Sequence, residues 1–274
     1  MSATTKAEPA GASMRAKYGP WAVIAGASEG TGAEFARQIA AQGVSCLLVA
    51  RRLEPLQRLA QEIRSQYAVE TRVLSQDLSA PDAAERIKAA AADLEVGLYV
   101  SNAGADSSGL RFLDAPLEKW HRLMNMNVLT VMDAVYAFAP AMKARGRGGL
   151  LLMSSGAALG GQPRLAMYSG TKAFEVNFAE SIWGELKPCG VDVLTVAAPA
   201  MDTPVLREAL VRNNLTVGQL IQPADVVRIA LAELPVGPTY VFPMDPREDA
   251  QDLNAARRQR LAQVTEITNM FFGP

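Results

Sequence analysis

Short apolar runs and longer amphipathic stretches alternate along the chain from Trp21 onward. The short runs are continuous and rich in leucine and β-branched residues, which is typical of strands buried on both faces of a sheet. Strand and helix alternating over the whole length predict an α/β fold, a doubly wound parallel sheet of about seven strands flanked by helices. The predicted strands are Ala22–Ala25, Ser45–Ala50, Thr71–Leu74, Leu98–Ser101, Gly149–Met153, Val191–Ala198 and Tyr240–Phe242, with helices near 30–42, 53–67, 81–92, 117–144, 166–187 and 223–233.

The ends of the chain and one internal segment depart from this alternation. Residues 1–17 are rich in Ala, Ser, Thr, Gly and Pro without periodicity, so we expect a flexible tail there. No linker divides residues 18–274, which predicts a single domain. The segment 199–222 exceeds an ordinary connection and is predicted to be a substrate lid. The aromatic C-terminal end has three open interpretations: frayed, docked on a partner, or folded over a pocket.

Composition excludes several classes of protein. The net charge of −1 gives no reason to expect nucleic acid or an anionic membrane as a partner. The longest stretch without a charged residue, Gly148–Pro163, holds five glycines, so we expect no membrane span. Cys46 and Cys189 are interpreted as structural free thiols, which fits a reducing, cytoplasmic location. With His121 as the single histidine, no metal site is predicted.

A glycine-rich turn joins the first predicted strand to the first helix. Gly26, Gly30 and Gly32 permit a tight turn and a close approach of backbone to a pyrophosphate, while the helix N-terminus offers free N–H groups. Three glycines alone also fit an ordinary turn. The strand before them and the amphipathic helix after them favour a dinucleotide site in a Rossmann fold.

The choice of dinucleotide is predicted from the end of the second strand. An NAD enzyme needs a carboxylate there for the ribose hydroxyls, but no acidic residue occurs between Glu34 and Glu54. Arg51 and Arg52 follow the strand instead, and a guanidinium can bind the 2′-phosphate of NADP. The sequence therefore favours NADP(H), with Arg51 the better candidate. Glu29 near the same edge would repel a phosphate unless it turns outward.

A tyrosine and a lysine four residues apart form the candidate catalytic pair. Tyr168 and Lys172 lie on one face of a predicted helix. A free tyrosine has a pKa of about 10, and a nearby ammonium, joined by the positive nicotinamide of an oxidised cofactor, favours the phenolate. Because such pairs are common on surface helices, the assignment depends on further residues.

Taken together, the motifs resemble the short-chain dehydrogenase/reductase family over about residues 20–245. The spacing Gly-x3-Gly-x-Gly is similar to that family's, although Ala25 and Thr31 replace its usual Thr and Ile. Ser155 lies thirteen positions before Tyr168, the family's usual separation, and Ser154 is the neighbouring alternative. The resemblance implies four catalytic residues, which are Ser155, Tyr168, Lys172 and Asn127, with Asn127 positioning a water that relays protons through Lys172.

The same resemblance implies further contacts to the cofactor. Asp77 would bind the adenine amino group, and Asn102-Ala103-Gly104 would back the adenosine pocket. Thr203 comes one residue earlier after Pro199 than in the family, and would bind the carboxamide. The complete predicted cofactor set is Gly26, Ser28, Gly30, Thr31, Gly32, Arg51, Arg52, Asp77, Leu78, Asn102, Ala103, Gly104, Tyr168, Lys172, Pro199 and Thr203.

The predicted function is NADP(H)-dependent interconversion of a carbonyl and a secondary alcohol on an apolar substrate. Some of these motifs resemble those of reductases that act on 3-oxoacyl and steroid substrates. The resemblance does not decide among steroids, acyl chains and aromatic ketones as the substrate. An NAD-dependent alcohol dehydrogenase and a non-catalytic NADP-binding sensor remain the alternatives. The resemblance also implies a homodimer or homotetramer, and the apolar segments Val128–Met142 and Phe174–Trp183 are consistent with it. Candidate residues of the substrate pocket are Ala157, Leu159, Met167, Met201, Leu206 and Phe271 or Phe272.

Overall fold

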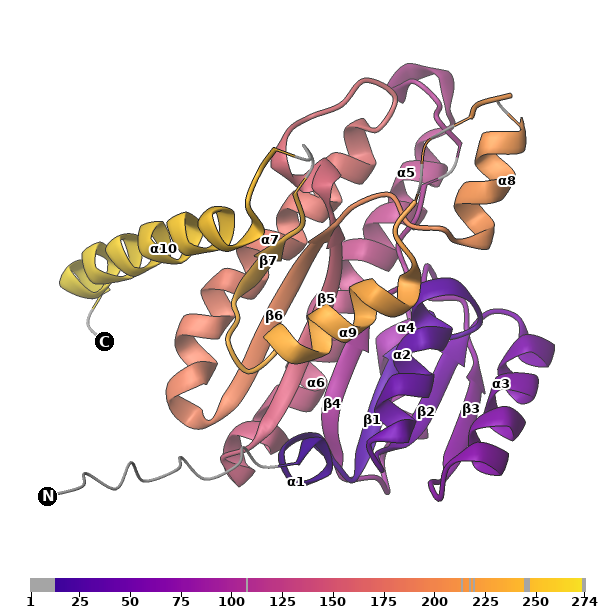
Figure 1. The fold of residues 1–274 in the computed structure, drawn as a ribbon, viewed down its shortest axis with the longest axis vertical. Helices are drawn as coiled ribbons and strands as arrows, with labels where there is room; N and C mark the ends of the chain where they lie inside the picture. The colour runs from indigo at the N-terminus through magenta and orange to yellow at the C-terminus, as the bar shows by residue number, and fades with distance from the viewer. Residues whose placement is uncertain are drawn as a thin grey trace, which may run out of the picture.

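The computed structural model describes residues 13–272, apart from 107, 213, 217, 219 and 244–246. Within this part of the chain, seven parallel strands form one sheet in the order β3-β2-β1-β4-β5-β6-β7 (Figure 1). Each predicted strand is present, and the predicted α/β sheet is confirmed. The strands are β1 Trp21–Ala25, β2 Ser45–Ala50, β3 Thr71–Ser75, β4 Val96–Ser101, β5 Gly148–Ser155, β6 Val191–Ala198 and β7 Thr239–Val241.

Helices cover both faces of the sheet. One apolar core lies between the sheet and α2, α3 and α9, and a second lies between the sheet and α4, α6 and α7. Because each central strand is buried on both faces, its apolar residues run continuously rather than alternating. The α-helices are α1 Met14–Tyr18, α2 Gly30–Ala41, α3 Leu53–Gln66, α4 Ala83–Ala90, α5 Leu117–Met124, α6 Thr130–Arg145, α7 Ala166–Leu186, α8 Pro204–Arg212, α9 Pro223–Glu233 and α10 Ala250–Phe272. Shorter helical turns are η1 Phe112–Asp114, η2 Asn125–Leu129, η3 Gly156–Leu159 and η4 Lys187–Cys189.

Two sequence-based expectations need correction. The predicted tail of residues 1–17 is wrong at its C-terminal end, because Met14–Tyr18 forms helix α1; residues 1–12 lie outside the described part. Ser13 caps this helix, and Tyr18 is buried against the sheet, so tertiary contacts order a segment without helical periodicity. The helix predicted over 117–144 is interrupted, because η2 is a π-helical turn between α5 and α6. Among the described residues, no helix combines the length and apolarity that crossing a membrane requires.

The strand order reverses direction at β1 and β4. In open α/β sheets of this kind, ligands bind beyond the carboxyl ends of the strands at such a switch point. The backbone N–H groups of Asn102 and Ala103, just after β4, donate to the carbonyl of Ala25, where β1 ends. The predicted glycine turn and the predicted Asn-Ala-Gly turn therefore meet at the switch point.

The last helix is anchored at its start and extends from the body of the protein (Figure 1). The side chain of Asn254 accepts a hydrogen bond from the backbone N–H of Val241 (2.7 Å) and donates to its carbonyl (3.1 Å). Arg257 forms an ion pair with Glu180 of α7. The two Asn254 contacts satisfy the backbone of Val241, in the strand at the sheet's edge. Farther along α10, Val264 and Met270 are exposed.

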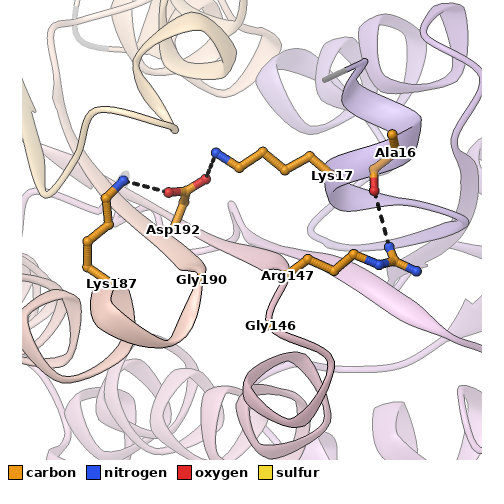
Figure 2. Close-up of a pocket in the computed structure, with 7 residues that line it drawn as sticks. All are labelled: Ala16, Lys17, Gly146, Arg147, Lys187, Gly190 and Asp192. Carbon is orange, nitrogen blue, oxygen red and sulfur yellow. Dashed lines mark hydrogen bonds and ion pairs between the residues drawn. The ribbon is translucent and has the colours of Figure 1, made fainter. Parts of the chain in front are cut away.

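A buried carboxylate ties α1 to the opposite, amino-terminal edge of the sheet (Figure 2). Asp192 of β6 accepts a hydrogen bond from the Tyr18 hydroxyl at 2.6 Å and pairs with Lys17 and Lys187. Burial and the adjacent carboxylate raise the pKa of Tyr18, which keeps this phenol protonated. Lys17, Lys187 and Asp192 border a surface hollow of about 460 Å³. Two lysines offset one desolvated carboxylate, so this cluster fixes the end of α1.

Replacing Asp192 with Ala is expected to lower the free energy of unfolding by about 3 kcal/mol, because the buried Tyr18 hydroxyl and two lysines lose their acceptor. Urea denaturation would measure this loss. Glu54→Ala is the control, since the Glu54 side chain is 78% exposed and pairs only with Arg58 in the described contacts. That change should stay within about 0.5 kcal/mol, and an equal loss in both variants would contradict the role given to Asp192.

Candidate active site

The glycine turn between β1 and α2 is shaped for close backbone packing. Gly26 and Gly30 have φ values of +92° and +54°, which favour glycine. A Cβ on Gly32 would lie 1.9 Å from the carbonyl oxygen of Gly26, so only glycine fits at the start of α2. Asn102 donates a side-chain hydrogen bond to the same oxygen at 3.1 Å. The turn therefore leaves the N-terminus of α2 open to an anionic group, as a dinucleotide site requires.

The segment after β6 lies against this turn. Cγ2 of Thr203 is 3.3 Å from the position a Cβ on Gly30 would occupy, and the Thr31 hydroxyl donates to the sulfur of Met201 at 3.5 Å. Thr203 also accepts from the backbone N–H of Leu206 at the start of α8. The structure thus brings Thr203 to the glycine turn despite its shifted position after Pro199. Its contact with a carboxamide stays a prediction.

The two arginines after β2 differ in their surroundings. Arg52 forms an ion pair with Glu29 at 2.6 Å, whereas the Arg51 side chain is exposed beside it. In the described contacts, Arg51 takes part through its backbone carbonyl, which accepts from the Ser75 hydroxyl at 2.9 Å. The negative charge of Glu29 is therefore directed to Arg52. This arrangement favours Arg51 as the group for a 2′-phosphate, as the sequence predicts.

Asp77 is already well supplied with donors. It accepts from the backbone N–H and hydroxyl of Ser79, and Arg122 of α5 donates to its other oxygen at 2.8 Å. Although burial opposes ionisation, these hydrogen bonds hold the pKa of Asp77 below its usual range. The next residue, Leu78, is buried, and its carbonyl accepts from Thr130. An adenine amino group would meet a carboxylate fixed in place; that contact stays a prediction.

The candidate catalytic pair lies at the start of α7. The Lys172 Nζ is 6.0 Å from the centroid of the Tyr168 ring, close enough for its charge to act on the phenol. Lys172 is almost fully buried and donates to the Met153 carbonyl of β5 at 2.8 Å. It also donates to both carboxylate oxygens of Glu175, each at 2.9 Å. The helix and the end of β5 together fix the ammonium.

The two serines at the end of β5 have different partners. The buried Ser154 hydroxyl donates to the Lys172 carbonyl at 2.8 Å, which uses its only hydrogen. The half-buried Ser155 hydroxyl accepts from the Ala157 N–H at 3.2 Å, so its own hydrogen is free to donate to a substrate oxygen. The surroundings thus favour Ser155, in agreement with the spacing from Tyr168.

Asn127 lies in the π-helical turn η2 and is fully buried. Its Nδ2 donates to the Thr171 hydroxyl at 2.9 Å, but its Oδ1 has no hydrogen-bond partner among the residues that the structure describes. Gly104, with φ +139°, packs here: a Cβ on it would lie 2.6 Å from Asn127 Oδ1 and 2.9 Å from Lys172 Nζ. Asn127 and Lys172 are therefore neighbours. A buried amide oxygen without a donor is suited to accept from a water beside Lys172.

One residue of the site, Glu175, was not predicted. It follows Lys172 by three positions on α7, and it is the acidic member of the otherwise apolar run Ala173–Val176. An acidic residue on the apolar face of a helix was the available signal, since such residues are buried only when paired. Lys172 is the partner here.

A metal centre has no support in the described part of the chain. No group of three or more His, Cys, Asp or Glu side chains is placed to hold a metal ion there. His121 is exposed on α5, and both cysteines are free. Burial raises the pKa of the Cys46 thiol to about 12, which makes it an unreactive part of the core.

Comparisons with known proteins identify the family of the chain. Residues 20–213 match the family described as short chain dehydrogenase. A 7beta-hydroxysteroid dehydrogenase from Collinsella aerofaciens is 37% identical over 193 residues, which are 70% of this chain and 73% of that protein. The chain belongs to the short-chain dehydrogenase/reductase family of oxidoreductases.

Two solved structures share the fold. A short-chain dehydrogenase from Sphingobium yanoikuyae in complex with NADPH is 25% identical with a TM-score of 0.78, covering 90% of this chain and 95% of that one. A 3-ketoacyl-(acyl-carrier-protein) reductase from Brucella melitensis complexed with NADH is also 25% identical. Its TM-score is 0.70, covering 82% of this chain and 95% of that one. The two relatives thus carry different nicotinamide cofactors.

Proposed function

We propose that the protein interconverts a carbonyl and a secondary alcohol on an apolar substrate with NADP(H). The observation that carries this proposal is the grouping of Tyr168, Lys172 and Asn127 beside the carboxyl end of β5, near the glycine turn. The close backbone packing at Gly32 fits the binding of a dinucleotide over the glycine turn. The Asn127 Oδ1, which has no partner among the described residues, fits a bound water. Bound NADP(H) would supply or accept a hydride at its nicotinamide ring.

In this mechanism, Tyr168 gives a proton to the substrate oxygen during reduction and takes it during oxidation. The Ser155 hydroxyl donates a hydrogen bond to the same oxygen and stabilises its developing charge. The Lys172 ammonium favours the phenolate of Tyr168. Asn127 holds a water that returns the proton through Lys172. These roles use the donor and acceptor atoms that the fold leaves available.

The test is NADPH oxidation, followed at 340 nm, with a panel of steroid, 3-oxoacyl and aromatic ketones. Turnover of at least one apolar ketone is expected. Tight NADPH binding without turnover of any ketone would instead support the sensor, the non-catalytic alternative. That alternative is disfavoured because Ser155, Tyr168, Lys172 and Asn127 are all present.

For the cofactor, the exposed Arg51 and the lack of an acidic residue between Glu34 and Glu54 favour NADP(H). The NADPH-bound relative supports the same choice, while the NADH-bound relative keeps an NAD-dependent dehydrogenase as the alternative. Arg51→Ala is expected to raise the Kd of NADPH about tenfold, since charge-assisted hydrogen bonds to the 2′-phosphate are lost, and to leave the Kd of NADH unchanged. Fluorescence titration with both nucleotides measures this.

The matched control is Arg52→Ala. Arg52 is paired with Glu29, so its loss should weaken NADPH binding less than the loss of Arg51. Equal Kd values for NADPH and NADH in the unmodified protein would remove the proposed role of Arg51.

The substrate pocket is proposed to lie beside η3 and the segment after β6. Ala157 is buried and Leu159 half-exposed on η3, and Met201 lies at the glycine turn. Helix α8 within 199–222 is proposed to act as a lid over this pocket. The hydroxysteroid relative supports a bulky apolar carbonyl compound. Phe271 is exposed on α10, and the side chain of Phe272 lies outside the described residues.

A single domain and a homodimer or homotetramer are also proposed. Apolar side chains remain exposed along η2 and α6, which supports a contact between copies. They are Leu129, Met132 and Tyr136, exposed by 45%, 39% and 82%.

A further inference from the structure

Glu175 and Lys172 form an ion pair inside the protein. They are three residues apart on α7, with side-chain exposures of 1% and 3%. Lys172 Nζ lies 2.9 Å from each carboxylate oxygen, and its remaining described hydrogen bond goes to the Met153 carbonyl. An apolar pair of similar volume would cost less desolvation at this position. The carboxylate therefore needs an explanation beyond stability.

The charged neighbours of this pair are few. Tyr168, one helical turn before Lys172, has its ring centroid 6.0 Å from Nζ. Tyr99 of β4 is buried, and its pKa is raised by burial and by the charge of Glu175, against the effect of the Ser101 hydroxyl. The other groups in the described contacts of the pair and its neighbours are neutral, namely the Met153 carbonyl and Ser154 of β5, Asn127 of η2 and Thr171 of α7. Within the described contacts, Lys172 is thus the charged group placed beside the Tyr168 ring, and Glu175 is its ion-pair partner.

We propose that Glu175 is a positioning residue for the proton chemistry of Tyr168. Its carboxylate holds the Lys172 ammonium in place and offsets its charge, so Tyr168 keeps its proton to a higher pH than beside an unpaired ammonium. This proposal rests on the proposed function, in which Tyr168 exchanges a proton with the substrate oxygen. A phenol that stays protonated near neutral pH suits donation to a carbonyl, so the pair favours the reductive direction.

The titration of the carboxyl agrees with this role. Burial raises the pKa of Glu175 to about 7, while Lys172 acts in the opposite direction. The carboxylate is therefore present above neutral pH. It is thus charged in the pH range in which phenols lose their protons.

The experiment is a spectrophotometric titration of phenolate in the cofactor-free protein. Tyr168→Phe, made in both the unmodified and Glu175→Gln backgrounds, isolates the signal of Tyr168 by difference. Glu175→Gln keeps the shape of the side chain and removes its charge. We expect the pKa of Tyr168 to fall by about one unit in this background. In the cofactor-bound enzyme, the acidic limb of the pH–rate profile for alcohol oxidation should shift to lower pH by the same amount. Oxidation at a pH on that limb should therefore become about tenfold faster.

Two variants complete the design. Glu185→Gln removes a charge from an exposed position of the same helix and should leave the Tyr168 titration unchanged. Glu175→Asp, which withdraws the carboxylate by one methylene, should give an intermediate shift and serves if the Gln variant does not fold. An unchanged Tyr168 pKa in a folded Glu175 variant would reduce Glu175 to a structural role, and a raised pKa would reverse the proposed sign. Failure of the ketone panel would overturn the proposed function alone, because the phenol titration needs no turnover.

Discussion

Replacing Tyr168 with Phe is expected to lower kcat for ketone reduction about a thousandfold, because the variant lacks the group that we propose gives the proton to the substrate oxygen. The aromatic ring remains, so the packing around Lys172 should persist. The Kd of NADPH should change less than about threefold, since most of the binding surface is untouched. Absorbance at 340 nm measures turnover, and nucleotide fluorescence measures binding.

Tyr136→Phe is the matched control for this substitution. Tyr136 lies on α6 with its side chain 82% exposed, and removal of its hydroxyl should leave both kcat and the Kd of NADPH unchanged. Turnover retained in Tyr168→Phe at the level of the control would show that another group transfers the proton.

The second large effect is expected from Gly32→Ala in the glycine turn. The added methyl would lie 1.9 Å from the Gly26 carbonyl oxygen and 2.7 Å from Nδ2 of Asn102, so the turn must move. We expect the Kd of NADPH to rise about a hundredfold, because the N–H groups proposed to bind the pyrophosphate would lose their alignment. Overpacking should also lower the free energy of unfolding by about 2 kcal/mol. Nucleotide titration and thermal unfolding measure the two effects.

Gly184→Ala separates this steric effect from the general effect of alanine in a helix. Gly184 lies in α7, and no atom outside its own helix turn approaches the position of a Cβ. Alanine there should stabilise the protein by up to about 1 kcal/mol and leave NADPH binding intact. Tight NADPH binding by Gly32→Ala would mean that the nucleotide does not lie over this turn.

The sheet and its helices could be predicted because the signals are local. Continuous apolar runs specify strands buried on both faces, and the helices between them show a 3.6-residue period. Helix α1 escaped prediction because its order depends on Tyr18 reaching Asp192, 174 residues later. No local pattern encodes such a contact.

In the candidate site too, local sequence patterns predict some features and tertiary structure decides others. The positions of Tyr168, Lys172 and Ser155 follow from spacing, whereas their partners depend on the packing of side chains. Sequence alone did not reveal the pairing of Glu29 with Arg52 or the burial of Glu175 against Lys172. Both contacts are set by side-chain directions that tertiary structure decides, and both change the electrostatics of the predicted residues.

The π-helical turn at Asn125–Leu129 joins α5 to α6. The direction of the side chains along these helices therefore depends on the number of residues in the turn. An α-helix turns by about 100° per residue, so one residue added or removed redirects every later side chain. Deleting a residue here would convert the turn into a regular helix, yet it would rotate Asn127 or α6 away from its present neighbours. Surface loops in general tolerate changes of length, but these five residues must keep their number for Asn127 to stay beside Gly104 and Thr171.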